Sequence, residues 1–254
     1  MTDIAIIVAT HKKYWMPDDP VYLPLFVGRE GKAELAYAGD NTGDNISLKN
    51  SHYCELTGLY WAWKNLAAEY LGLVHYRRHF CTRLFGPAKE RVLSRKEAER
   101  LLKRADVILP KPRRYWIETT YSQYVHAHNA ADLELTREII TERCPEYLAA
   151  FDTVMKRTWG HRFNMFIMKR EFADAYCAWL FDILFALEER LDISAYSDYD
   201  KRVFGFVGER LMDVWLEKNK IHSLDIPYVF MEKQNWLKKG TAFLLRKFRA
   251  GKDK

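Results

Sequence analysis

An uninterrupted apolar run near the start of the chain constrains the fold more than any other feature. Residues 4–9 are Ile-Ala-Ile-Ile-Val-Ala, with no polar side chain among them. A strand that is apolar on both faces is typical of the interior of a parallel sheet, because helices then cover both faces. The run therefore predicts a buried strand in a parallel sheet.

Later segments alternate between strand and helix. Apolar residues from Asn50 to Tyr70 recur at steps of three and four, as on one face of a helix, and Ser94 with Glu97 has the spacing of a capping box. Such alternation predicts an α/β fold. Strands are predicted at 4–9, 22–27, 106–109, 164–168 and 223–231, helices at 50–70, 94–104, 145–155, 171–190 and 200–219, and an aromatic loop at 111–128.

Composition narrows the class of protein. The 254 residues fit one large domain with a small appendage, and the net charge of +6 favours anionic partners such as nucleotides, nucleic acid or acidic lipid. The four cysteines form no CxxC pair, which fits a reducing cytoplasm and disfavours zinc or redox motifs. We expect no signal peptide and no membrane span, because no apolar run is long enough.

The segment 72–80 carries the strongest functional signal. It begins as an apolar strand and then changes at once to His75-Tyr76-Arg77-Arg78. Ligands of open α/β sheets bind at the carboxyl ends of strands, and arginine binds phosphate bidentately. Paired arginines could neutralise a diphosphate leaving group. The alternative is a surface strand end whose arginines pair with acids elsewhere.

Two loops extend this signal. Thr10-His11-Lys12 follows the first strand, where doubly wound sheets commonly bind nucleotides. The segment Asp40-Asn41-Thr42-Gly43-Asp44-Asn45 is rich in short acids and amides that could hold a metal, a ribose or a sugar hydroxyl. It lacks the length and closing glutamate of an EF-hand. The alternative is an Asx-type turn that caps the following helix.

Three further features are consistent with the binding of a second substrate that accepts a transferred group. Glu209 lies just ahead of an apolar helical stretch and could act as a general base, although it could instead simply favour the positive end of that helix. His161 and Asn164 precede a predicted strand. Trp61 and Trp63 must face different sides of their helix, so one of them could line a pocket.

These motifs, taken in order, resemble one known family. The segments that carry the resemblance are 10–12, 40–47, 53–65, 72–78, 164–168 and 205–211. Together they are similar to a bacterial capsular and exopolysaccharide biosynthesis family long labelled a domain of unknown function, now grouped with glycosyltransferases, some of them galactofuranosyltransferases. The resemblance spans roughly residues 4–231.

The resemblance implies a GT-A-like fold with a Rossmann-type mixed sheet and a helical C-terminal part. It implies a glycosyltransferase domain over 1–231, with a nucleotide-sugar part at about 1–112 and an acceptor part at about 113–231. The expected reaction transfers a hexose, galactofuranose or galactose, from a UDP-sugar to a capsular, O-antigen or exopolysaccharide acceptor with inversion.

Roles for individual residues follow from the same resemblance. The expected catalytic residues are Glu209 as base, with Arg77, Arg78 and His75 at the departing UDP. The expected acceptor or sugar contacts are His161, Asn164 and Trp61. The expected nucleotide-sugar contacts are Thr10, His11, Lys12, Asp40, Asn41, Asp44, Asn45 and Tyr76.

Metal dependence stays open at the sequence level. Most GT-A enzymes carry an Asp-x-Asp metal motif after a central strand, where this chain has His75-Tyr76-Arg77-Arg78. Either the arginines replace the ion, or Asp40 and Asp44 hold Mn²⁺ or Mg²⁺ from another loop.

The segment 232–254 is predicted to be a basic amphipathic tail. Leu237, Leu244 and Phe248 fall on one helical face among many lysines and arginines, so the tail could hold a cytoplasmic enzyme at the inner membrane near a lipid-linked acceptor. The alternative is a frayed terminus.

Two other function classes are consistent with the sequence. One is a non-catalytic protein that binds nucleic acid or another polyanion, whose affinity would fall steeply with salt. The other is a phosphodiesterase built on His75, His79 and His161. No P-loop, GxSxG or HExxH motif is present, so ATPase and common hydrolase functions lack their usual support.

Overall fold

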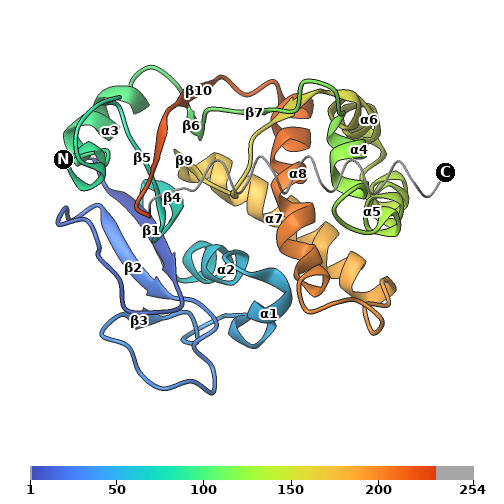
Figure 1. The fold of residues 1–254 in the computed structure, drawn as a ribbon, viewed down its shortest axis with the longest axis horizontal. Coiled ribbons are helices and arrows are strands. Elements are labelled where there is room, and N and C mark those ends of the chain that lie inside the picture. Colours follow the sequence, from blue (N-terminus) through green and yellow to red (C-terminus); the bar gives the residue numbers. More distant parts are fainter. Residues whose placement is uncertain (1, 233–254) are drawn as a thin grey trace.

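A computed structural model describes residues 2–232 as a mixed sheet flanked by helices (Figure 1). The central strands are ordered β10-β6-β9-β4-β1-β2-β3, and β5 joins β4 to β11. The strands of this sheet are β1 (Ile4–Thr10), β2 (Tyr22–Phe26), β3 (Ala38–Gly39), β4 (Tyr70–His75), β5 (Arg78–Phe80), β6 (Val107–Pro110), β9 (Phe166–Lys169), β10 (Ser223–Ile226) and β11 (Tyr228–Phe230).

Helices flank this sheet, others lie to one side of it, and β7 (Arg113–Arg114) and β8 (Trp159–Gly160) form a separate pair (Figure 1). Within residues 2–232, no helix is both long and apolar enough to cross a membrane. The helices are α1 (Asn50–Tyr53), α2 (Leu56–Asn65), α3 (Arg95–Leu102), α4 (Thr120–Val125), α5 (Ala130–Arg143), α6 (Leu148–Lys156), α7 (Arg170–Arg190) and α8 (Val203–Asn219).

The topology places a ligand edge beside β1. The chain passes from β1 to β2 and β3 on one side, then returns through α1 and α2 to β4 on the other side. Both β2 and β4 are parallel to β1. The carboxyl ends of β1 and β4 therefore meet at the point where the strand order reverses, which is where open α/β sheets bind ligands.

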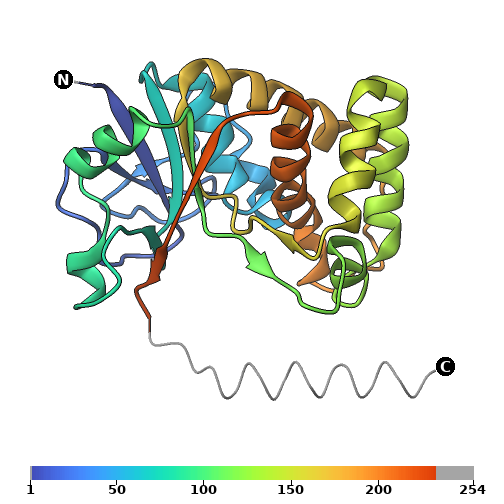
Figure 2. The same cartoon turned by 90° about the horizontal axis from the view of Figure 1, so that it is seen from above.

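The first strand is buried on both faces, as its sequence predicts. Ile7 and Ala9 face the core shared with α2, α7 and α8, whereas Ile6 and Val8 face the core shared with α3. The helices α4, α5 and α6 pack against α7 and α8 away from the sheet (Figures 1 and 2). The predicted α/β class and the helical C-terminal part are both present.

The predicted helix from Asn50 to Tyr70 is wrong in detail, because the chain breaks it at Cys54. That residue has φ 54° and ψ −130°, which ends α1 and lets α2 start in a new direction. The strand β4 already begins at Tyr70. The capping box of Ser94 and Glu97 is confirmed at the start of α3.

Two further differences have local causes. The predicted loop at 111–128 contains β7 and α4, and α5 was not predicted at all. The buried face of α5 includes Asp132, whose carboxylate accepts hydrogen bonds from Tyr124 and Tyr196. This buried acid interrupts the apolar stripe by which a helix is predicted from sequence. Pro227 divides the predicted late strand into β10 and β11. The predicted basic tail, beyond Glu232, lies outside the described residues.

We predict that Gly58→Ala destabilises the fold. A Cβ atom at Gly58 would lie 2.7 Å from Val27 Cγ1 and 3.2 Å from Leu25 Cδ2, so α2 would have to move off the sheet. Overpacking of this kind costs about 1–3 kcal/mol, which thermal unfolding would measure. The exposed change Lys64→Ala on the same helix is the control, and equal melting temperatures for the two variants would contradict the prediction.

Candidate functional site

The carboxyl ends of β1 and β4 bring the first two predicted segments together. Tyr76 lies at their centre, with the ring of His11 at 5.3 Å between centroids. Lys12 Nζ and the Arg77 guanidinium lie 5.3 and 5.1 Å from the centre of the Tyr76 ring. One aromatic ring thus gathers three basic side chains that come from two different strands.

Several positive charges lie close together at this edge and affect the pKa of His11. Burial lowers the pKa of His11, and Arg77, Lys12, Lys32 and Arg202 lower it further. Arg77 lies 3.6 Å from Glu232. Lys12, Lys32 and Arg202 form no ion pair with a carboxylate in the described part of the chain. Such a cluster of cations is suited to a phosphate-bearing ligand.

Thr10 shapes this edge through its backbone turn. Its hydroxyl donates to the Lys12 carbonyl oxygen at 2.7 Å and accepts from the Lys12 N–H at 3.3 Å. The side chain is buried, so its visible role is to direct His11 and Lys12 outwards.

Arg78 points into a different environment from Arg77. Its guanidinium lies 4.3 Å from the centre of the Phe163 ring, and its Nε is buried without a hydrogen-bond partner. Burial and the charge of Arg77 lower the pKa of Arg78, whereas Glu209 and Glu55 raise it. Arg78 is therefore the cation that lies between the basic edge and two carboxylates.

The loop at 160–164 connects those carboxylates to β4. Phe163 and Asn164 adopt the left-handed conformation, with φ of 80° and 52°. The Phe163 N–H donates to Glu209 Oε1 at 3.1 Å, and its carbonyl oxygen accepts from His75 Nε2 at 2.7 Å. His75 Nε2 must carry the proton in this contact, because a carbonyl oxygen only accepts.

Glu55 is the second carboxylate that contacts the loop at 160–164. It accepts from Asn164 Nδ2 at 2.6 Å, and its Oε1 lies 3.8 Å from His75 Nε2. No sequence pattern predicts a role for Glu55, because its position depends on the break after α1. The only available signal was its place in the motif at 53–65.

Glu209 lies well inside α8, so the alternative role at a helix N-terminus is wrong. The helix begins six residues earlier, at Val203, and Gly205 and Gly208 belong to it. Glu209 Oε2 accepts from Arg210 at 3.0 Å, and the side chain retains 18% exposure. A partly exposed carboxylate held by a backbone N–H and a guanidinium is suited to proton transfer.

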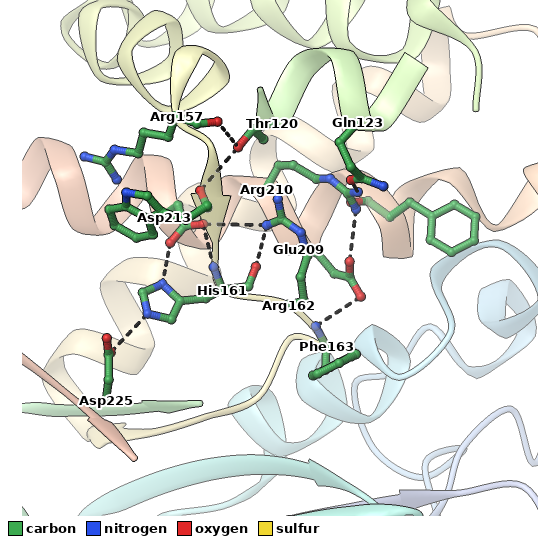
Figure 3. Close-up of polar contacts among 12 residues, drawn as sticks. Thr120, Gln123, Arg157, His161, Arg162, Phe163, Glu209, Arg210, Asp213 and Asp225 are labelled. Atoms are coloured by element: carbon green, nitrogen blue, oxygen red, sulfur yellow. Dashed lines mark hydrogen bonds and ion pairs between the residues drawn. The ribbon is translucent and has the colours of Figure 1, made fainter. Parts of the chain in front are cut away.

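His161 supports the structure of this loop through two aspartates, whereas the sequence predicts a contact with a sugar. Its Nδ1 lies 2.5 Å from Asp213 and its Nε2 lies 3.0 Å from Asp225, so both ring nitrogens are occupied (Figure 3). Burial would lower the pKa of His161, but hydrogen bonds to Asp213 and Asp225 raise it to about 9. The Asp213 carboxylate also accepts from the His161 N–H at 2.9 Å.

Two other expected sugar contacts have structural partners. Asn164 is buried, and its Nδ2 donates to Glu55 and to the Gly205 carbonyl oxygen. Trp61 is also buried and donates from Nε1 to Thr42 Oγ1 at 2.9 Å. Asn164 positions Glu55 through Nδ2 and keeps a buried Oδ1 without a hydrogen-bond partner, whereas Trp61 holds the loop after β3 through its ring N–H.

Asp40 is a buried structural carboxylate, which corrects its expected role at ribose, sugar or metal. Oδ2 accepts from the Gly28 N–H at 2.8 Å and from Thr57 at 2.6 Å. Oδ1 accepts from the Arg29 N–H at 3.1 Å and from Ser47 at 2.5 Å. All four acceptor positions of the carboxylate are thus occupied.

The other residues of the segment 40–45 bond to neighbouring segments or to their own turn. Asn41 donates to Glu30, and Asn45 bonds to its own turn in the Asx manner. Asp44 accepts from Tyr60, and its carbonyl accepts from Asn65 at the end of α2 opposite Glu55, about 15 Å along the helix axis. The Asx-turn alternative describes this loop best.

The residues present do not fit the expected metal site. Asp40 has no free acceptor, and Asp44 lies at the far end of α2. Within residues 2–232, no group of three or more His, Cys, Asp or Glu side chains is arranged to hold a metal ion.

The histidines of the phosphodiesterase alternative do not form one site. His79 is fully buried beside Tyr22, and burial lowers its pKa to about 4. His75 is bonded to Phe163, and His161 lies between two aspartates. The three rings have separate partners, so this alternative loses its geometric basis.

Comparison with known families identifies the chain. A family model described as a domain of unknown function, DUF4422, matches residues 5–220. The chain belongs to this family. No curated protein was found to match it.

One solved structure is similar over most of the chain. It is the apo form of WbbM, a bifunctional glycosyltransferase, with 29% sequence identity and a TM-score of 0.85. The match covers 91% of this chain and 46% of WbbM, so this member of the DUF4422 family spans about half the length of that protein. The expected GT-A-like α/β fold is thereby confirmed.

We predict that the His161 ion pairs make stability fall with rising pH. The pKa is about 9 in the folded state against about 6.5 when unfolded. The contribution is complete below about pH 6.5, where both states hold the proton, and is lost as pH rises towards 9. It amounts to on the order of 3 kcal/mol. Denaturant unfolding at pH 6 and 9 measures it, and His161→Gln should flatten that difference.

Proposed function

We propose that this DUF4422 chain is a glycosyltransferase with its active site between the basic edge and Glu209. The observation that carries the proposal is the loop at 160–164, which holds Glu209 through the Phe163 N–H and His75 through the Phe163 carbonyl. A carboxylate is thereby fixed near Arg78, within a cation-rich site. The similarity to WbbM, a bifunctional glycosyltransferase, supports the same function.

The donor is proposed to be a UDP-sugar bound with its diphosphate at the basic edge. Lys12, His11 and Arg77 surround Tyr76 there, and Arg78 extends the positive charge towards the carboxylates. Charge placed in advance where the leaving group develops its own stabilises the transition state. Arg202, from the start of α8, faces the same edge.

The proposed reaction is a single displacement with inversion. The acceptor hydroxyl oxygen attacks the anomeric carbon, the bond from that carbon to the diphosphate oxygen breaks, and UDP leaves with the electron pair. Glu209 takes the hydroxyl proton as the new bond forms. Glu55 and His75 are proposed to hold the geometry around the sugar, since both contact the loop that holds Glu209.

The finer specificity is part of the same proposal. The sugar is a hexose, galactofuranose or galactose, and the acceptor is a capsular, O-antigen or exopolysaccharide chain, lipid-linked at the cytoplasmic face of the inner membrane. Residues 1–112 supply the donor edge and 113–231 supply Glu209 and its loop. Nucleic acid is not among the proposed partners.

A polyanion-binding protein is less well supported. Its binding surface would be uniformly basic, whereas the carboxylates of Glu55 and Glu209 are held by the loop at 160–164 beside Arg78. Both carboxylates raise the pKa of Arg78, which shows that they act on the same group. Two acids held in that position favour a reaction at a neutral hydroxyl over simple capture of a polyanion.

We predict that Glu209→Gln lowers kcat by about 10²–10⁴-fold while leaving the KM for the donor nearly unchanged. The amide keeps the shape of the side chain but cannot accept the proton. Release of UDP from UDP-galactose or UDP-galactofuranose, with an acceptor present, measures the rate. Glu171→Gln, on the surface of α7, is the matched control. Wild-type transfer by Glu209→Gln would remove the base assignment.

We predict that UDP, and not GDP, dTDP or CMP, raises the melting temperature. A ligand at 100 times its Kd adds about 2.7 kcal/mol of stability. The double variant Lys12→Gln/Arg77→Gln should lose most of this shift, whereas Lys13→Gln, on the adjacent exposed residue, should keep it. A UDP shift that survives a chelator is expected if cations alone hold the diphosphate, and a shift that requires Mn²⁺ would contradict that arrangement.

A further inference from the structure

Two loops project large apolar side chains into solvent. Between β5 and the short helix η2 (Ala88–Arg91), Leu84 is 60% and Phe85 is 89% exposed. Between β7 and α4, Trp116 is 82% and Ile117 is 67% exposed. Two adjacent apolar side chains with such high exposure are uncommon on the surface of a soluble protein, and they indicate an interaction site.

Both loops leave the same edge of the sheet. The Cys81 N–H donates to the Pro227 carbonyl oxygen, and the Lys111 N–H donates to the neighbouring Ile226 carbonyl oxygen, each at 2.9 Å. The loops therefore start on either side of the short link between β10 and β11. Figure 2 shows both segments on the lower side of the molecule, where the described chain also ends.

Cations surround the apolar side chains. Residues 83–91 and 111–114 contain six lysines and arginines. Their one acidic residue is Glu90, so these two segments carry a net charge of +5. None of the six forms an ion pair with a carboxylate within residues 2–232. They are Arg83, Lys89, Arg91, Lys111, Arg113 and Arg114.

We propose that this surface, Leu84–Phe85 and Trp116–Ile117 with the six cations, docks on an anionic lipid bilayer. Exposed aromatic and aliphatic side chains insert at the headgroup boundary, and each lysine or arginine near an anionic surface adds about 1 kcal/mol of attraction. Leu84 and Ile117 favour lipid over nucleic acid, because aliphatic side chains cannot stack on bases as aromatic rings do. The proposal does not depend on the catalytic one, since binding needs no donor.

The sequence beyond Glu232 agrees with the charge of this surface. Residues 233–254 contain eight lysines and arginines and one aspartate. A basic segment is repelled by a basic surface, whereas both are attracted to the same anionic bilayer. The carboxyl ends of β1 and β4 lie at this edge too, so docking would bring the site close to the lipid headgroups.

Flotation of the full chain with vesicles tests the proposal. Vesicles of phosphatidylcholine alone are compared with vesicles that also contain phosphatidylglycerol, at low and high salt. We expect binding to the anionic vesicles only. Leu84→Ser/Phe85→Ser and Trp116→Ser/Ile117→Ser should each weaken it about tenfold or more, and Arg113→Gln/Arg114→Gln on the order of 30-fold.

Leu48→Ser is the matched control, because Leu48 is 80% exposed beside α1, away from both loops. It should bind as wild type does, and all variants should melt alike because the changed side chains are exposed. Absence of wild-type binding to anionic vesicles overturns the proposal. So does unchanged binding of both apolar variants, and in that case competition by heparin or nucleic acid would identify a general polyanion surface.

Discussion

The site depends on one buried carboxylate, Asp213. It accepts hydrogen bonds from the backbone and ring of His161, and Arg162 lies 3.6 Å away, so the start of the loop at 160–164 is anchored to α8. Directly after this anchor, Phe163 and Asn164 adopt the left-handed backbone. The Phe163 peptide groups in turn fix Glu209 on one side and His75 on the other. Removing one partner from such a buried network is costly, because the remaining charges lose their compensation.

Charge separates into two zones around this loop. The carboxyl ends of β1 and β4 supply His11, Lys12 and Arg77, whereas the helical side supplies the carboxylates of Glu55 and Glu209. Arg78 and Arg202 each interact with both zones. This layout suits a substrate that is anionic at one end and neutral at the other, as a sugar joined to a diphosphate is.

The features that the sequence predicted well are those that depend on local pattern. The double burial of β1, the capping box at Ser94 and the convergence of residues 10–12 with 75–78 all follow from short apolar runs and strand ends. The failures involve residues whose role depends on distant partners. Asp40 and His161 are polar residues of the type that binds ligands, yet each has its polar side-chain atoms occupied by the protein itself. Glu55 gains its place only because the chain turns at Cys54, which no local pattern indicates.

The position of Arg78 has a consequence for the speed of the proposed transfer. Its guanidinium lies against the rings of Phe163 and Phe230, with a buried Nε that has no hydrogen-bond partner. Much of its water was therefore removed when the chain folded. When a leaving group develops negative charge nearby, little solvent has to reorient, so the reorganisation energy at that step is small.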